Sequence, residues 1–312
     1  MTPDFHAIFT GLCYKIAPLY ILIFLGILAG KFLKVDRKSI AALLFYIIVP
    51  IVFFDFALHT KIHTSYLLLP IIFYIMSITL SLIYLNISKQ VWREGARPNV
   101  IGFAAGTGNT GYFGLPVALM LFDAQTVGIY MLMNLGFSLF DYTFGAYVMA
   151  RGKYTSREAI IQVSKLPMIY AFILGLFLNY LFGIELPCEL RDVTDKMRSA
   201  YVVLGMMIIG LGIASVHTFS LDLKFLSILL SAKFIAAPIV VMLIIWIDKS
   251  AFHLFDPEIH KAMLLMSFVP PAANTVIFAT LHNSHPEDAA TAVLIGTIIA
   301  LIYLPAAVAI FF

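Results

Sequence analysis

The sequence predicts an all-α integral membrane protein with ten transmembrane helices, arranged as two inverted five-helix repeats. Of its 312 residues, 62% are hydrophobic and only 12% are charged, whereas a soluble domain carries about 25% charged residues. Apolar runs long enough to cross a bilayer follow one another along the whole chain. Two of these runs contain helix-breaking residues near their centres, at corresponding places in the two halves.

Each apolar run bounded by charged residues, Pro or Gly is interpreted as one span. The predicted spans are, in order, Ile16–Leu33, Ile40–Leu58, Tyr66–Ile87, Val100–Leu121, Thr126–Met149, Leu166–Phe182, Ala200–Val216, Leu223–Ile247, Ile259–Leu281 and Ala289–Phe312. At about 20 residues each, ten spans use about 200 residues and leave only short loops. We therefore expect one membrane domain, in which residues 1–150 form the first five-span repeat and residues 151–312 form the second.

The charged loops predict how the spans are oriented. Loops that follow the odd-numbered spans hold twelve Lys and Arg residues, and the opposite face holds seven. Short loops rich in Lys and Arg stay in the cytoplasm, so both termini are expected outside. The net charge of +3 is small and comes from these loops, which argues against nucleic acid as a partner.

The fourth span, Val100–Leu121, is predicted to break near Asn109. Its glycines are Gly102, Gly106, Gly108, Gly111 and Gly114. Each glycine weakens the helix interior, and Pro116 removes a backbone donor and crowds the preceding turn. In hydrocarbon, each unsatisfied N–H or C=O group costs several kcal/mol. The break must therefore be buried in protein or line a polar cavity.

The ninth span, Ile259–Leu281, is predicted to break at Pro270-Pro271, which together lack two backbone donors. Shifting the sequence by 165 positions aligns the two broken spans without a gap. The matched pairs are Asn109 with Asn274, Thr110 with Thr275, and Phe113 with Phe278. Because five spans is an odd number, the second unit must enter the membrane from the opposite side, as in many secondary transporters. A chance match between apolar sequences is the alternative explanation.

The first and sixth spans show a weaker match. Pro18 and Gly26 in the first span find Pro167 and Gly175 in the sixth, at the same internal spacing. This pair of matches extends the predicted repeat beyond the broken spans.

Two crossing breaks would place half-helix ends in the middle of the membrane. A helix N-terminus carries about half a positive charge and free N–H donors, so an anion is the expected ligand. The amides of Asn109 and Asn274 can cap a half-helix or present a donor and an acceptor to a ligand. Alternatively, these residues only form hydrogen bonds between helices and the prolines only kink them. The predicted substrate-binding residues are Gly108, Asn109, Thr110, Tyr112, Pro116, Pro270, Pro271, Asn274 and Thr275.

Two charged residues lie deep within spans, Asp141 in the fifth and Lys233 in the eighth. An ionisable group there costs at least about 2.5–3.5 kcal/mol and usually marks a pathway or a partner. Their depths, about 12 and 15 Å from the cytoplasmic ends, are compatible with pairing. Lys233 reaching the membrane surface alone is the alternative. Asn134 and Ser138 either extend a polar lining towards Asp141 or form hydrogen bonds between helices.

Signatures of enzymes and metal sites do not occur in a suitable context. The two cysteines lack metal-ligand spacing, and the chain carries no phosphate-binding loop, nucleophile elbow or dinucleotide fingerprint. We therefore expect no catalytic residues, no metal and no cofactor. A channel, or a membrane-embedded sensor that binds an organic anion without moving it, remains the alternative to a carrier.

The segments GNTGYFGLP (Gly108–Pro116) and PPAANT (Pro270–Thr275) carry a family resemblance. With ten spans and outer termini, the chain resembles the auxin efflux carrier family, which includes plant PIN-type carriers and bacterial permeases proposed for malate, malonate and related carboxylates. Plant members usually insert a long hydrophilic loop between the fifth and sixth spans. Here only residues 151–165 join them, which favours a bacterial-type permease of the plasma (bacterial inner) membrane.

The resemblance implies an elevator-type carrier. It implies a scaffold of spans one, two, six and seven, and a mobile transport unit of spans three to five and eight to ten. Substrate, a carboxylate such as malate, malonate or an auxin-like acid, is then held where spans four and nine cross. The expected partners are this small organic anion and the lipid bilayer. The sequence does not decide between a homodimer and a monomer.

The loop charges make a prediction about the termini. Alkaline phosphatase is active only outside the cytoplasm, so a fusion after Phe312 should be active and a fusion after Lys153 inactive. Enzyme assays on intact cells measure both. The reverse result, an inactive fusion at Phe312 with an active one at Lys153, would contradict the orientation.

Overall fold

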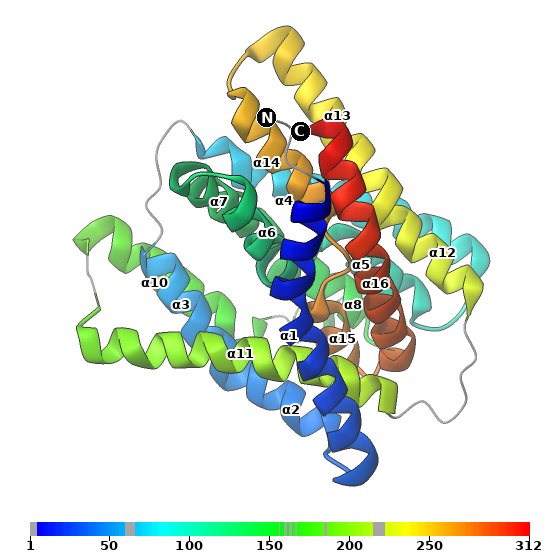
Figure 1. Ribbon diagram of the computed structural model, residues 1–312. Coiled ribbons are helices and arrows are strands. Elements are labelled where there is room, and N and C mark those ends of the chain that lie inside the picture. Colours follow the sequence, from blue (N-terminus) through cyan, green and yellow to red (C-terminus); the bar gives the residue numbers. More distant parts are fainter. Residues whose placement is uncertain are drawn as a thin grey trace.

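A computed structural model of the chain is helical throughout its described part (Figure 1). It describes residues 5–59, 66–155, 157–158, 161, 164–165, 167–183, 186–214 and 222–312. Within these residues, three helices are long and apolar enough to cross a membrane: Leu68–Val91, Leu223–Phe252 and Pro286–Phe311. A fourth span is added if the bent pair Pro257–Phe268 and Ala273–Leu281 counts as one. The prediction of a helical membrane fold agrees with this architecture.

The first half of the chain forms helices at the predicted spans, although α1 begins at Phe5, eleven residues before the predicted start at Ile16. They are α1 (Phe5–Phe32), α2 (Arg37–Leu43), η1 (Leu44–Ile48), α3 (Val49–His59), α4 (Leu68–Val91), α5 (Arg97–Gly106), η3 (Thr110–Gly114), α6 (Leu115–Leu121), α7 (Ala124–Phe140), η4 (Asp141–Gly145) and α8 (Ala146–Arg151). The η elements are single π-helical turns that continue directly into their neighbours. Such turns widen a helix locally and occur often at functional sites.

The second half is built in the same way. Its elements are α10 (Pro167–Phe182), α11 (Cys188–Ala214), α12 (Leu223–Ser231), η5 (Ala232–Ala236), α13 (Ala237–Ile247), η6 (Asp248–Phe252), α14 (Pro257–Phe268), α15 (Ala273–Leu281) and α16 (Pro286–Phe311). The two predicted breaks are present, because α5 and η3 are separate, as are α14 and α15.

Helix α11 differs most clearly from the prediction. It begins at Cys188, twelve residues before the predicted start at Ala200. The added residues contain no Pro or Gly, and Lys196 donates to Asp192 one turn earlier at 2.6 Å, a pair that supports a helix. The predicted span contained no charged residues, and the first turns of α11 lie outside it because they are charged. Arg198 consequently lies within a helix and not in a loop.

Two helix pairs approach each other very closely. Helix α1 packs against α11, and α10 packs against α3 (Figure 1). A Cβ atom on Gly26 of α1 would lie 2.2 Å from the backbone oxygen of Met207 in α11, and one on Gly175 of α10 would lie 2.6 Å from the backbone oxygen of Phe54 in α3. Small residues permit such contacts in membrane helices. The two glycines are those matched between the first and sixth spans.

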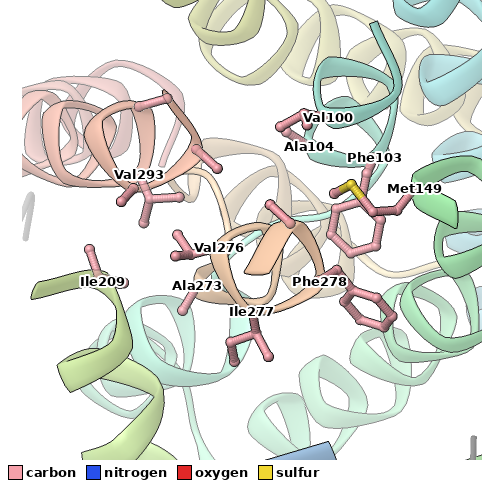
Figure 2. Packing of buried hydrophobic residues seen from close by; sticks show 14 of the residues in the cluster. Val100, Phe103, Ala104, Met149, Ile209, Ala273, Val276, Ile277, Phe278 and Val293 are labelled. Carbon is pink, nitrogen blue, oxygen red and sulfur yellow. The ribbon is translucent and has the colours of Figure 1, made fainter. Parts of the chain in front are cut away.

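The second half of the broken ninth span is enclosed on several sides. Figure 2 shows Val276 and Phe278 of α15 among side chains from α5, α8, α11 and α16. The rings of Phe278 and Phe103 lie 4.9 Å apart between centroids, and all three side chains are fully buried or nearly so. The break is therefore held inside protein and away from lipid, as its unpaired backbone requires.

Adding a methyl group at either close contact should destabilise the fold. Gly26→Ala and Gly175→Ala force backbones apart, so each should lower the free energy of unfolding by about 1–3 kcal/mol. Gly205→Ala in α11 is the matched control, because no atom lies within 4 Å of its Cβ position. Thermal unfolding in detergent measures all three. Unchanged midpoints for Gly26→Ala and Gly175→Ala would contradict the close packing.

Candidate functional site

The two helix breaks touch each other. Helix α14 and helix α15 meet at an angle of 46°. The backbone N–H of Asn109, in the first break, donates to the carbonyl oxygen of Pro270, in the second, at 2.9 Å. A backbone donor freed by one break thus pairs with an acceptor freed by the other.

Side chains satisfy further backbone groups of the first break. Lys233 donates from Nζ to the carbonyl oxygen of Thr107 at 2.5 Å, and the Tyr130 hydroxyl donates to that of Thr110 at 3.0 Å. The side-chain oxygen of Asn109 accepts from the N–H of Phe113 at 3.2 Å, so Asn109 caps η3. These contacts replace helical hydrogen bonds that an unbroken span would have made.

Asn274 has a different role, although the repeat aligns it with Asn109. Its amide nitrogen donates to Oδ2 of Asp141 at 2.6 Å. Its amide oxygen accepts from the hydroxyl of Tyr201 at 2.7 Å. The residue at the cap position of α15 is Ala272, which forms no side-chain cap. Asn274 therefore links the fifth predicted span to α11 through both ends of its amide.

Asp141 and Lys233 both lie in π-helical turns, Asp141 at the start of η4 and Lys233 in η5. Both side chains are buried, but no ion pair within 4 Å joins them. Lys233 instead binds the carbonyl of Thr107 and lies 5.9 Å from the ring centroid of Phe137. The Thr107 side chain faces Asp141 without hydrogen-bond geometry, because its hydroxyl and Oδ1 of Asp141 are unpaired within the described part of the chain. The charges of Asp141 and Lys233 attract each other without direct contact, and both side chains lie next to Thr107. The two residues are therefore close together, as predicted, but do not form the predicted ion pair.

A cavity of about 260 Å³ opens beside the crossing. Its polar lining is Gly108, Asn109, Thr110, Asn134, Ser138, Asp141, Tyr142, Arg198, Tyr201 and Asn274. The Thr110 hydroxyl donates to the amide oxygen of Asn134, which brings both predicted residues to one wall. Val52 of α3 and Val202 of α11 lie on other parts of the lining. The cavity thus receives groups from the crossing and from α3 and α11.

Arg198 is a lining residue that sequence reasoning missed as a site residue, as are Tyr142 and Tyr201. Its guanidinium pairs with Oδ2 of Asp55 at 2.6 Å, and Thr194 donates to Oδ1 of the same carboxylate at 3.0 Å. Asp55 is buried, whereas Arg198 remains about half exposed. The sequence did contain a signal for Arg198, because the carboxylate of Asp55 inside the second predicted span needs a cation as a partner. Counting Arg198 as a loop charge concealed its role.

Gly108 lies where the lysine reaches the break. A Cβ atom there would lie 3.2 Å from Nζ of Lys233 and 2.8 Å from a methyl group of Val269. Glycine therefore gives the ammonium group access to the backbone. Of the predicted pair Pro270-Pro271, the first contributes its carbonyl to Asn109, and both are buried outside the cavity lining.

Besides Pro270 and Pro271, three further predicted site residues are not brought to the cavity by a described contact. Thr275 is fully buried, and its hydroxyl has no hydrogen-bond partner among the residues described. The backbone of Tyr112 and Pro116 belongs to η3 and α6, but their side chains lie outside the described part of the structure.

Sequence comparison with known proteins gives evidence that is independent of the structure. A family model described as "membrane transport protein" matches residues 12–308. An uncharacterized transporter of Methanocaldococcus jannaschii is 24% identical over 248 residues, which is 76% of this chain and 77% of that protein. The family match includes both helix breaks, and the match to the transporter covers most of the chain.

The convergence of Asp141 and Lys233 predicts energetic coupling. Lys233→Met removes a charge-assisted hydrogen bond worth about 1.5–3 kcal/mol and leaves Asp141 without a nearby opposite charge. Asp141→Asn keeps an oxygen for Asn274, so Lys233→Met should cost less in that background. We expect a coupling energy of about 0.5–3 kcal/mol in a double-mutant cycle on unfolding free energy.

Asp123→Asn supplies the control cycle. Asp123 is exposed and caps α7, and asparagine caps as well as aspartate. Its effect should add to that of Lys233→Met. Strict additivity for Asp141→Asn with Lys233→Met would show that the two residues are not coupled.

Proposed function

This chain belongs to the membrane transport protein family, and we propose that it is a secondary transporter of a small organic anion. Membership confirms the resemblance to the auxin efflux carriers and makes the protein a multi-pass membrane transporter and not an enzyme. The substrate and the mechanism are the proposal, and the meeting of the two breaks at a polar cavity carries it.

The electrostatics of the crossing favour an anion. Helices η3–α6 and α15 both begin at the crossing, where their first N–H groups lack helical partners and their dipoles present positive charge. Asn109 and Asn274 line the same cavity with amides, and Arg198 adds a cation. A carboxylate matches these groups, with malate, malonate or an auxin-like acid as the specific candidates.

We propose the ten-span inverted repeat as the topology of the transporter. Under it, α1 and α10 correspond, as do the second and seventh spans. The packing of α1 against α11 then has its counterpart in the packing of α10 against α3. Gly26 and Gly175 form equivalent close contacts in these two pairs. This exchange of partners supports repeats at residues 1–150 and 151–312. The loop charges support the proposal that both termini lie outside the plasma (bacterial inner) membrane.

An elevator-type movement is the proposed mechanism. The scaffold consists of α1 to α3 with α10 and α11, and the transport unit consists of α4 to α8 with α12 to α16. Arg198 and Tyr201 line the cavity from the scaffold, and Asn109 and Asp141 line it from the transport unit. Substrate at such a boundary would travel with the transport unit while the scaffold stays fixed. The Tyr201–Asn274 hydrogen bond must then break in each cycle.

Counterflow in reconstituted vesicles tests the proposal. Vesicles loaded with unlabelled malate, malonate or an auxin should accumulate the same labelled acid from outside, and the rate should saturate. Flux that rises linearly with concentration and shows no counterflow would indicate a channel. Binding without flux would indicate a sensor.

Asn109→Ala and Asn274→Ala should weaken substrate binding. Each removes a hydrogen bond to a carboxylate worth about 1.5–3 kcal/mol, or about tenfold to more than hundredfold in affinity. Substrate-dependent thermal stabilisation and counterflow measure the loss. Asn109→Ala also removes a cap worth about 0.5–2 kcal/mol, so folded yield is measured beside transport.

Ile302→Leu on the exposed face of α16 is the control, because a conservative change facing lipid should alter neither stability nor flux. Asn109→Ser separates the two roles of Asn109, since serine keeps the cap without the amide. Normal binding and transport by both alanine variants would contradict a substrate site at the crossing of the two broken spans.

A further inference from the structure

We propose that Asp141 binds a proton together with each organic anion, so that transport is driven by protons and not by sodium. This inference rests on the proposed function, in which an anion occupies the cavity at the crossing. It assigns the coupling ion and the residue that carries it.

The carboxylate of Asp141 lines the cavity proposed for another negative charge. A sphere of 260 Å³ has a radius of about 4 Å, so any anion in the cavity lies close to this carboxylate. Two like charges in a buried site disfavour each other strongly, and such pairs share a proton. Protonated Asp141 therefore accepts the anion and ionised Asp141 repels it.

The surroundings of Asp141 offer a place for the proton. Oδ2 already accepts from Asn274, whereas Oδ1 has no hydrogen-bond partner among the described residues. The Thr107 side chain faces Asp141, and its hydroxyl is equally unpaired and buried. A proton on Oδ1 can be donated to that hydroxyl oxygen after a small rotation, so the neutral carboxyl group also has a buried partner here.

Charged and titratable groups from each neighbouring element face Asp141. Lys233 approaches Asp141 from η5, and Tyr142 directly follows Asp141 in η4. Tyr201 of α11 is connected to Asp141 through Asn274. Arg198 lines the same cavity but is paired with Asp55. Lys233 is therefore the cation that ionised Asp141 offsets. Protonation of Asp141 frees the positive charge of Lys233 to act on the substrate.

Lys233 also argues against a sodium ion at the break. In broken-helix transporters, carbonyl groups at a half-helix C-terminus coordinate the coupling cation. Here the carbonyl of Thr107, directly after α5, already accepts from the ammonium group of Lys233. A fixed cation occupies that place. The mobile positive charge is then the proton on Asp141.

Proteoliposomes with a pH-sensitive dye inside test the proposal directly. With the membrane potential clamped, adding malate or malonate outside should acidify the lumen of wild-type vesicles. An imposed proton gradient should drive accumulation of the transported acid, and a sodium gradient should not. The apparent affinity should fall about tenfold for each pH unit above the range where Asp141 is protonated.

Asp141→Asn mimics the protonated residue and keeps an oxygen for Asn274. It should lose substrate-driven acidification and lose the pH dependence of affinity, which substrate-dependent thermal stabilisation measures separately from flux. Asp123→Asn makes the same chemical change at an exposed helix cap and should behave as wild type. Thermal unfolding verifies that each variant is folded.

The outcomes separate this inference from the proposed function. Wild-type counterflow without substrate-driven acidification would overturn the proton inference and leave the carrier intact, a result that needs no variant. Acidification that persists in folded Asp141→Asn would overturn the assignment to Asp141. Absence of counterflow in wild type for every acid would overturn the proposed function and, with it, this inference.

Discussion

Backbone groups released by two helix breaks form the constraint on which the rest of the structure depends. Inside a membrane such groups have no water to bind, so protein must supply every partner. The first break receives the carbonyl of Pro270, the hydroxyl of Tyr130 and the ammonium group of Lys233. These partners come from α14–α15, α7 and η5, which must therefore pack around the crossing. The enclosure of α15 in Figure 2 follows from the same requirement.

The matched segments of the two halves share a backbone plan but not a set of functional side chains. Asn109 and Asn274 occupy aligned positions, yet the first caps a half-helix and the second joins Asp141 to Tyr201. At the same shift of 165 residues, Asp141 aligns with Ala306 and Asn134 aligns with Ile299. The polar side chains of Asn134 and Asp141, which the fifth predicted span contributes to the cavity, thus have no counterpart in α16. A duplicated unit can keep its breaks for structural reasons while only one copy carries the charged chemistry.

Sequence reasoning was strongest where a physical cost leaves a visible pattern. Breaks in apolar spans and buried charges are costly, so Asn109, Pro270, Asp141 and Lys233 stood out, and the structure brings all four to one region. It was weaker where the pattern is ordinary. Tyr201 sits among other aromatic residues in a membrane helix and carries no local signal that it faces Asn274.

The edges and contacts of α11 show why other details could not be predicted. Its charged first turns look like a loop to a search for apolar residues, yet salt bridges and helix-forming residues extend the helix to Cys188. This placed Arg198 outside the predicted spans. The choice between a direct Asp141–Lys233 pair and a shared contact at Thr107 depends on rotamers and on the turn geometry of η4 and η5. Spacing along the sequence does not determine either.

Charge balance around the cavity explains how the proposed anion site is built from weak donors. With all four groups ionised, Asp55 offsets Arg198 directly and Asp141 offsets Lys233 at a distance, so the empty site is formally neutral. An unpaired cation here would be costly to bury, and a paired one attracts a substrate only weakly. Helix N-termini and amides avoid both problems, because dipoles bind an anion without adding net charge. A neutral site made of dipoles, with one carboxylate able to change its charge, can bind an anion and still release it.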